Sequence, residues 1–259
     1  MDLDSSFGIK SSFQIVPEDR YKVSSAFLNS IRAGGCEVNV HDLNHDGNLY
    51  RDRDTFLQRA KRINNYSEAF GALGFRSAAL YRNLNWYDAL TCSYDMSVPN
   101  VGHLDPQRGG CCTVMPFYVG NILELPLTTT QDYTLFNILG QYSLDLLKHQ
   151  TAGILKAHGL ISFNIHPDYV IPLGARQCYA SLLEYICRLR GEQRIWVARP
   201  GEIAEWWRQR TQMRLVHEGA GWHIRGVGSE RARLAWAVLE DNSEVTYLDT
   251  VAHADYLSR

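Results

Sequence analysis

The sequence lacks several features that would assign a chain to a protein class directly. No Cys-x-x-Cys pair occurs among its six cysteines, which argues against a zinc ribbon. Six cysteines in 259 residues are also too few for a scaffold held by disulfides. No apolar run approaches the roughly 18 residues that a membrane-spanning helix needs, and we find no internal repeat or low-complexity tract. We therefore expect a globular protein without a membrane span.

An excess of charge of one sign is also missing. The chain carries 26 basic and 28 acidic residues, a net charge of -2, and has no basic stripe, so we expect no nucleic-acid partner. Apolar residues make up an ordinary 45%. The first four residues, 1–4, are acidic where a secretory signal is basic. If Met1 is the genuine start, this favours a cytoplasmic protein.

Strand and helix patterns alternate along the first two hundred residues. Strands are expected at 11–17, 36–40, 75–80, 111–119, 160–165 and 195–198, and helices at 22–32, 53–70, 132–158, 175–190 and 201–210. This alternation predicts βα units and a mostly parallel sheet. Short alternating segments then follow, divided by turns at 219–221 and 241–243. We expect an α/β domain over residues 1–211 and a β-rich appendage of three or four strands over residues 212–259.

Two histidines four residues apart follow directly after the strand expected at 36–40. If the chain is helical there, His41 and His45 lie on one face and can share a metal ion. Imidazole suits zinc and other late divalent ions. His-x-x-x-His by itself is a weak motif, and two polar residues in a surface turn are the simpler interpretation.

The same stretch also resembles a calcium-binding loop. Asp42, Asn44, Asp46 and Gly47 match the first positions of an EF-hand loop. The twelfth position, however, should be acidic and is Arg53, and a strand precedes the loop where an EF-hand has a helix. The pattern therefore argues against calcium.

Three further polar residues lie near the ends of expected strands. His166 follows the strand at 160–165 and precedes a proline, which disfavours continuation of the strand. Arg76 and Asp95 lie near two earlier strand ends and could form a charge pair in a cleft. Taken singly, each is more simply a strand-end histidine or a surface charge. Their order along the chain carries more information than any one of them.

That order resembles the NodB-type polysaccharide deacetylase family of carbohydrate esterases. The sequence has His-x-x-x-His after one strand, then an arginine, then an aspartate, then Ile-His-Pro, in the family's order. The stretches GFRSAALYRN (74–83), GGCCTVMPF (109–117) and WVARPGEIAEWWRQR (196–210) are similar to family segments as well. The likeness covers about residues 1–210. It implies a distorted (β/α) barrel with a divalent metal, usually zinc, at its carboxyl-terminal rim.

The resemblance also implies roles for the residues singled out above. His41 and His45 would be metal ligands, and His166 would be the general acid that protonates the departing amine. Arg76 would orient the catalytic base, and Asp95 would tune His166. The implied activity is removal of N-acetyl groups from an amino-sugar polymer by metal-activated water.

One family motif is missing, an Asp-Asp pair that ends the first barrel strand and supplies the base and the third metal ligand. Asp2 and Asp4 lie too close to the strand at 11–17 to replace it, so we expect a barrel incomplete at the N-terminus and an impaired site. Two alternatives remain: a non-catalytic glycan-binding or scaffold relative, and a metallohydrolase acting on another amide. His103 and Asp105 lie in a loop where they could touch substrate, although a loop without a role is the simpler interpretation.

Overall fold

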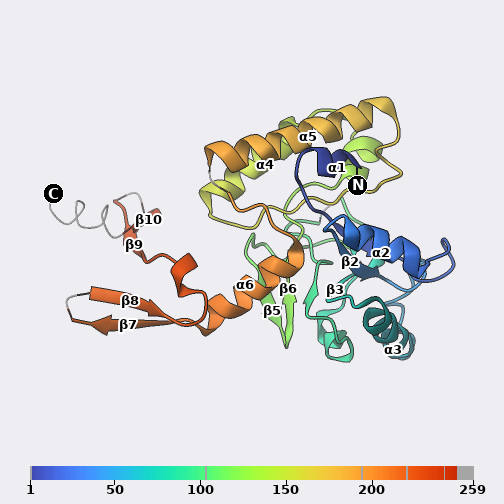
Figure 1. Ribbon diagram of the computed structural model, residues 1–259, viewed down its shortest axis with the longest axis horizontal. Helices are drawn as coiled ribbons and strands as arrows, with labels where there is room; N and C mark the ends of the chain where they lie inside the picture. Colours follow the sequence, from blue (N-terminus) through green and yellow to red (C-terminus); the bar gives the residue numbers. More distant parts are fainter. Residues whose placement is uncertain (1, 103, 194, 220, 242, 250–259) are drawn as a thin grey trace. The chain divides into compact units, whose positions relative to one another are not determined.

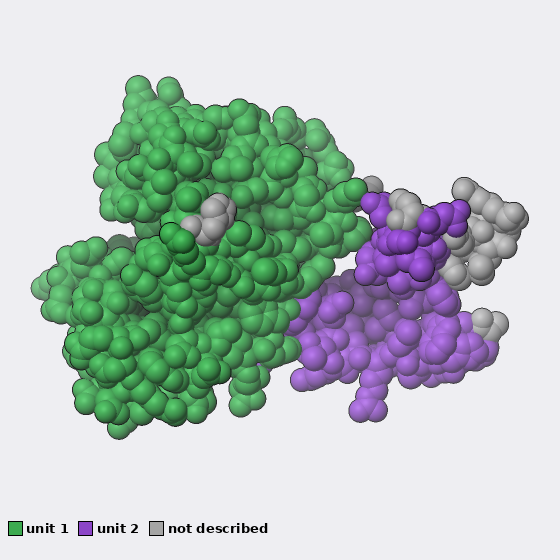
Figure 2. Space-filling view, turned by 180° about the vertical axis from the view of Figure 1, so that it is seen from behind, with its two compact units in different colours: residues 1–204 green, residues 205–259 purple. Residues whose placement is uncertain are grey.

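The computed structural model describes residues 2–102, 104–193, 195–219, 221–241 and 243–249. The chain divides into two compact units, residues 1–204 and 205–259 (Figure 2). The division falls within helix α6, Pro200–Gln212, whereas the sequence predicted a boundary at residue 211. All five residues singled out for a role in the site belong to the first unit.

A six-stranded sheet forms the centre of the first unit, in the order β1-β2-β3-β4-β6-β5 (Figure 1). Its strands are β1 (Ser12–Ile15), β2 (Glu37–His41), β3 (Gly74–Arg76), β4 (Tyr94–Asp95), β6 (Ile122–Glu124) and β5 (Phe117–Val119). Strands β1 to β4 and β6 run parallel, and β5 pairs with β6 antiparallel. The expected α/β architecture with a mostly parallel sheet is confirmed.

Two capped helices connect the first three strands. Helix α2 (Ser25–Ala33) begins where the Ser24 hydroxyl accepts a backbone hydrogen bond, and α3 (Arg53–Phe70) begins at Asp52 in the same way. Helix α3 ends at Gly71, whose φ of 58° is left-handed and costs glycine little. The apolar faces of both helices pack with the sheet in one core that includes Ile31, Val40, Phe56, Ile63 and Phe75.

The single helix predicted over 132–158 is wrong. A π-helix, η3 (Thr134–Ile138), comes first, and α4 (Asp145–Lys156) follows after a break. Gly140 adopts a φ of 62° in the break, and the Ser143 hydroxyl accepts the backbone N–H of Asp145. The apolar periodicity did mark buried positions, because side chains from both helices pack on α5 (Leu173–Glu192). Periodicity alone, however, does not reveal that a left-handed residue separates the two helices.

Several predicted strands are shorter than expected or irregular. Over 75–80, β3 ends at Arg76 and a 3₁₀ helix, η1 (Ala78–Leu80), follows. Over 111–119 only β5 is regular, and Cys112 has a φ of 53° that interrupts an extended chain. Residues 160–165 and 195–198 form no regular strand among the described residues. At residue 162, the chain pairs with Thr128 through side chains. The backbone N–H of each of these two residues donates to the hydroxyl of the other, where a regular strand would bond to a backbone carbonyl.

Several elements, β4 among them, lie outside the segments predicted as helix or strand. Strand β6 and the 3₁₀ helix η2 (Leu84–Ala89) were not predicted at all. Helix α1 (Asp2–Ser6) is a single short segment ahead of β1. None of the helices in the described ranges is both long enough and apolar enough to cross a membrane.

The second unit is β-rich, as expected. Strands β7 (Arg214–Glu218) and β8 (Gly221–Arg225) form one antiparallel pair, and β9 (Ala235–Leu239) and β10 (Val245–Asp249) form another. A 3₁₀ helix, η4 (Ser229–Arg231), lies between the pairs in the sequence. The predicted turns at 219–221 and 241–243 include residues 220 and 242, which lie outside the described residues.

Candidate active site

Polar side chains lie at the carboxyl ends of four parallel strands. His41 is the last residue of β2, Arg76 of β3, Asp95 of β4 and Glu124 of β6. His41 is in register with Arg76, and Asp95 is in register with Glu124. Because α/β domains place ligands at the carboxyl ends of their parallel strands, this edge of the sheet is the candidate active site.

The two histidines of the predicted metal pair lie beside each other. Their ring centroids are 4.8 Å apart, with the rings edge to face. The segment is not helical, because β2 leads into a loop in which Asp42 and His45 have φ values of 54° and 57°. The rings therefore meet through left-handed loop residues and not through helical spacing.

His41 is held in one tautomer by the backbone. Its Nδ1 lies 2.9 Å from the carbonyl oxygen of Arg76. A carbonyl oxygen only accepts, so Nδ1 carries the proton and Nε2 keeps its lone pair. Burial is the main reason that the pKa of His41 is lowered to about 3, and the charges of His45, Arg76 and His166 lower it as well. A neutral ring with a free Nε2 is the form that binds a divalent metal.

Among the described residues, a divalent metal would find two ligands here and no third. Catalytic zinc normally takes three protein ligands and a water. In the described part of the chain, no three His, Cys, Asp or Glu side chains stand close enough together to hold a metal ion. His41 and His45 therefore fit only part of a ligand set, and we assign no reaction step to a metal. Metal binding at the pair stays a prediction.

The acidic loop after β2 binds an arginine. The guanidinium of Arg59, on α3, donates to both carboxylate oxygens of Asp46 at 2.6 and 2.7 Å and approaches Asn44 Oδ1 at 3.4 Å. This arginine holds the pKa of the Asp46 carboxyl well below its usual range. The guanidinium of Arg59 therefore already neutralises the Asp46 carboxylate that a calcium ion would need. This agrees with the sequence argument against calcium, which was based on Arg53.

His166 is held by a carboxylate that the sequence did not single out. Asp132 Oδ1 lies 2.6 Å from Nδ1 of His166, and Asp132 Oδ2 accepts the backbone N–H of His166 at 2.6 Å. The side chain of Asp132 is 1% exposed and that of His166 is 31% exposed. A buried carboxylate therefore fixes both the ring and its backbone, and Nε2 is the nitrogen left to meet a substrate.

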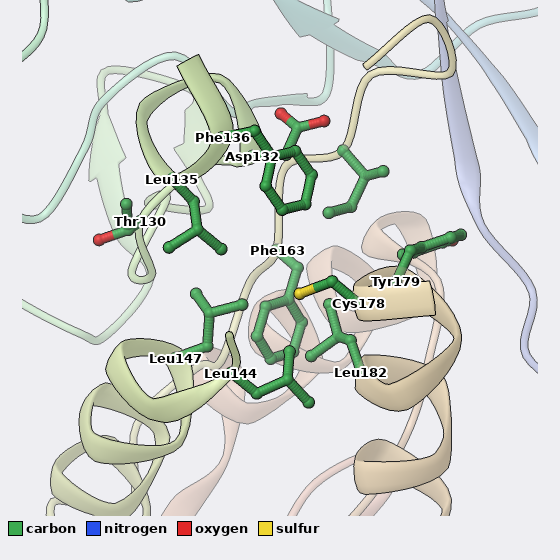
Figure 3. Close-up of a pocket in the computed structure, with 11 residues that line it drawn as sticks. Thr130, Asp132, Leu135, Phe136, Leu144, Leu147, Phe163, Cys178, Tyr179 and Leu182 are labelled. Atoms are coloured by element: carbon green, nitrogen blue, oxygen red, sulfur yellow. The ribbon is translucent and has the colours of Figure 1, made fainter. Parts of the chain in front are cut away.

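Apolar side chains from η3, α4, α5 and the segment at 163 pack beside Asp132 (Figure 3). They are Leu135, Phe136, Leu144, Leu147, Phe163, Cys178 and Leu182. The space between them is about 10 Å³, room for roughly one water molecule, so it is a packing gap and not a ligand site. In these low-polarity surroundings the hydrogen bond that Asp132 accepts from the histidine ring is stronger than it would be in water.

Arg76 is buried and joins two other segments. Its Nε donates to the carbonyl oxygen of Met96 at 3.0 Å, and its Nη1 donates to Oδ1 of Asn164. Burial lowers the pKa of the guanidinium, while neighbouring carboxylates oppose that shift. The backbone carbonyl of Asn164 also accepts the N–H of Asp132. Arg76 is therefore linked through Asn164 to the residue that holds His166.

The resemblance gave Asp95 the role of steadying the charge network and tuning His166, and in the structure the carboxylate that contacts the histidine is that of Asp132. Asp95 is fully buried, and its carboxylate accepts from the Tyr87 hydroxyl at 2.8 Å and from the N–H and hydroxyl of Ser97 at 3.1 and 2.7 Å. Over the described ranges, no hydrogen bond or ion pair joins Asp95 to His166 or to Arg76. Order along the chain could not show which aspartate the fold brings to the histidine.

Three residues of the site were missed from the sequence. Asn164 lies two positions before His166 in an extended segment, so strand alternation could have placed both on one face. Glu124 is a charge inside the apolar run ILELPL, which is an unusual place for one. Asp132 gave no local signal, because it follows a polar run of threonines in what reads as the start of a helix.

A cavity of about 350 Å³ lies beside this network. Its walls come from residues 99–101, 104–105, 114, 127–131 and 134, and from α4. The polar residues that line it are Asn100, Asp105, Thr128, Thr129, Thr130, Gln131, Thr134 and Gln150. Gln131 connects the cavity to the site, because it donates to Asp105 Oδ1 at 2.8 Å and accepts from Asn164 at 3.3 Å. Among the described residues the lining contains no lysine, arginine or aromatic side chain, which suits a neutral polar ligand.

Asp4, Asp105 and His103 were also considered from the sequence. Asp4 is buried on α1 and accepts a hydrogen bond from the Tyr179 hydroxyl on α5. Asp105 lines the cavity, as a substrate-contacting loop residue would. His103 lies outside the described residues.

The fold and the site geometry together define a polysaccharide-deacetylase-type α/β fold with a histidine–aspartate pair at its carboxyl-terminal rim. A Mycobacterium smegmatis protein described as a polysaccharide deacetylase matches with a TM-score of 0.63 and 17% identity, over 85% of this chain and 79% of its own. The allantoinase Puue matches with a TM-score of 0.57 and 17% identity, over 80% of this chain and 70% of its own. These likenesses confirm the predicted fold. No protein-family model and no curated protein matches the sequence.

Proposed function

We propose that this protein hydrolyses an amide bond and removes the acetyl group from N-acetylated amino sugars of a glycan. The observation that carries the proposal is the contact of the buried Asp132 carboxylate with Nδ1 of His166, whose side chain is partly exposed. The fold shared with a solved polysaccharide deacetylase supports the choice of substrate class.

The chemistry requires a proton donor at the leaving nitrogen. Water adds its oxygen to the acetyl carbon, the C–N bond breaks, and the sugar leaves as a free amine with acetate as the second product. An amine leaves only after its nitrogen gains a proton, which Nε2 of His166 supplies, and the Asp132 carboxylate stabilises the imidazolium that gives it. Arg76 acts through Asn164 to hold the backbone at Asp132, so it positions this acid.

We propose that the glycan enters the cavity beside Gln131. Amides and hydroxyls line it without a cationic side chain among the described residues, and this favours neutral N-acetylated sugars over sugars that carry a carboxylate. Its volume of about 350 Å³ lies at the low end of the range for small-molecule sites.

We also propose that His41 and His45 bind a divalent metal, zinc by the preference of imidazole. The support is the adjacent rings and the Nδ1 contact that leaves Nε2 of His41 free. The test measures zinc per chain after dialysis for His41→Ala, His45→Ala and His149→Ala, in which His149 is an exposed histidine on α4. The first two should lose zinc and the third should keep it. Zinc retained in all three contradicts the assignment.

The activity test supplies three substrate classes to the same zinc-treated protein. Acetate release is measured from chitooligosaccharides and from peptidoglycan fragments, and ring opening is measured with a cyclic amide. We expect slow release from chitooligosaccharides, because the described residues provide two of three metal ligands. His166→Asn should abolish it, and His149→Asn should leave it unchanged. Release that survives in His166→Asn contradicts the role of His166.

A second candidate is hydrolysis of a cyclic amide. The likeness to an allantoinase favours it, because the same proton transfer opens a ring as readily as it removes an acetyl group. Turnover of the cyclic amide alone would select this function. Chitooligosaccharide binding without any turnover would select a glycan-binding protein.

A further inference from the structure

Two carboxyl side chains lie next to each other, fully buried, at the ends of neighbouring strands. Asp95 ends β4 and Glu124 ends β6, and the two residues are partners in register across parallel strands. Both are 0% exposed. Two carboxylates so placed repel each other in a medium that screens little, so at neutral pH one of them must hold a proton.

The hydrogen bonds indicate which carboxyl group would carry the proton. Asp95 accepts from three donors, the Tyr87 hydroxyl and both groups of Ser97. Glu124 accepts from one, the backbone N–H of Val98 at 2.9 Å through Oε1. Its Oε2 is buried and has no donor facing it in the described part of the chain. A proton on Oε2, donated to Asp95, satisfies that oxygen.

The surrounding charges agree with a neutral Glu124. Burial, with the Asp95 charge second, raises the pKa of Glu124 well above its ordinary value. The other titratable or charged groups that act on the pair are Arg76 of β3, Tyr87 of η2, Tyr50, Cys92 and Cys111. An ionised Glu124 would place a second negative charge beside Asp95 in a buried site.

We propose that Asp95 and Glu124 share one proton, carried by Glu124, and that this pair positions Arg76. The pair fixes the chain at 96–98 from both sides, since Asp95 binds Ser97 and Glu124 binds Val98. Met96, in that turn, provides the carbonyl that receives Nε of Arg76. Ser97 also accepts the N–H of Ser77 and so locks the end of β3 to the same turn. The shared proton and the positioning of Arg76 do not depend on the proposed function; only a catalytic role of the site rests on it.

Infrared spectroscopy of the protein without substrate tests which carboxyl group carries the proton. The spectrum of the wild-type protein at pH 7.5 should contain the carbonyl band of a protonated carboxylic acid. That band should be absent from Glu124→Gln and present in Glu184→Gln, a control at an exposed glutamate of α5. A wild-type protein without the band, or a Glu124→Gln protein that keeps it, overturns the proposal.

The NMR resonance of the Nε–H group of Arg76 tests whether the Asp95–Glu124 pair positions this side chain. Its slow exchange with solvent should persist in Glu124→Gln, because the amide can donate to Asp95 and accept from Val98 as the protonated acid does. It should be lost in Asp95→Asn, which removes the charge and replaces one acceptor oxygen by a donor. The reverse pattern, with Asp95→Asn unchanged and Glu124→Gln disrupted, overturns the assignment of the proton. An unchanged resonance in both variants overturns the positioning role.

Activity separates this proposal from the proposed function. If the protein deacetylates chitooligosaccharides, Asp95→Asn should lower kcat with little change in KM, and the control Glu184→Gln should keep the wild-type kcat. If no substrate is turned over, the proposed function fails while the infrared and resonance results still decide the present inference.

Discussion

Both oxygens of one carboxylate hold His166. Asp132 accepts from the ring and from the backbone N–H of the same residue, and its own backbone N–H is held by the carbonyl of Asn164. A histidine that serves as an acid needs both the correct tautomer and a fixed direction, and Asp132 supplies the two together. The chemistry of this site therefore depends on a residue 34 positions away along the chain.

Asp132→Asn should lower kcat about 10²- to 10⁴-fold, with KM nearly unchanged. The asparagine can accept from only one of the two donors, so the ring is free to take the other tautomer. Steady-state kinetics on the active substrate provide the measurement, and circular dichroism checks that the fold is retained. A kcat within a factor of three of the wild-type value would show that Asp132 does not set the tautomer.

At the scale of elements, β3 and β4 approach each other closely at a glycine. Gly74 begins β3, and a Cβ there would stand 2.4 Å from the ring of Tyr94. The ring cannot move aside easily, because Tyr94 is buried and its hydroxyl is bound by Asn39 and donates to Glu37. The close contact brings Arg76 and Asp95 to neighbouring strand ends.

Gly74→Ala should destabilise the protein by roughly 1–3 kcal/mol, the usual cost of overpacking a core. Gly153→Ala is the matched control, since Gly153 lies within α4 with nothing within 4 Å of an added Cβ. That substitution should stabilise the helix by up to about 1 kcal/mol. Urea unfolding of both variants gives the comparison. Equal stabilities for the two would contradict the close approach of the strands.

The loop between β2 and α3 should respond to acid through Asp46. The Arg59 hydrogen bonds hold the pKa of Asp46 below its ordinary 3.8, so the pair stabilises the folded state above pH 3.8 and loses that contribution as the pH falls toward the lower folded value. Arg59→Gln should therefore lower the free energy of unfolding more at pH 6 than at pH 2.5. A difference in the free energy of unfolding between the two proteins that stays constant over this pH range would refute the pairing. In a separate measurement, added calcium should not raise the Tm of the wild-type protein.

For the molecule as a whole, Glu124 should give stability an opposite dependence on pH. Its pKa is raised on folding, so above the ordinary 4.5 the folded state binds more protons than the unfolded state, and stability falls as pH rises. The slope from one group is at most about 1.4 kcal/mol per pH unit. Glu124→Gln lacks this group, so its stability relative to the wild type should increase from pH 5 to pH 8. Chemical unfolding at several pH values measures the difference, and a flat difference contradicts a buried neutral acid.

The sequence by itself determined the alternation of helices and strands, the β-rich end and the strand-end positions of His41 and Arg76. These follow from local patterns, namely apolar periodicity and capping residues. The tertiary structure alone decided which groups meet. It brought Asp132 to His166, Asn164 to Arg76 and Arg59 to the acidic loop, and it set Glu124 beside Asp95 across parallel strands. Such contacts join residues distant in sequence, and no local pattern encodes which of several acids the fold will bury against a given base.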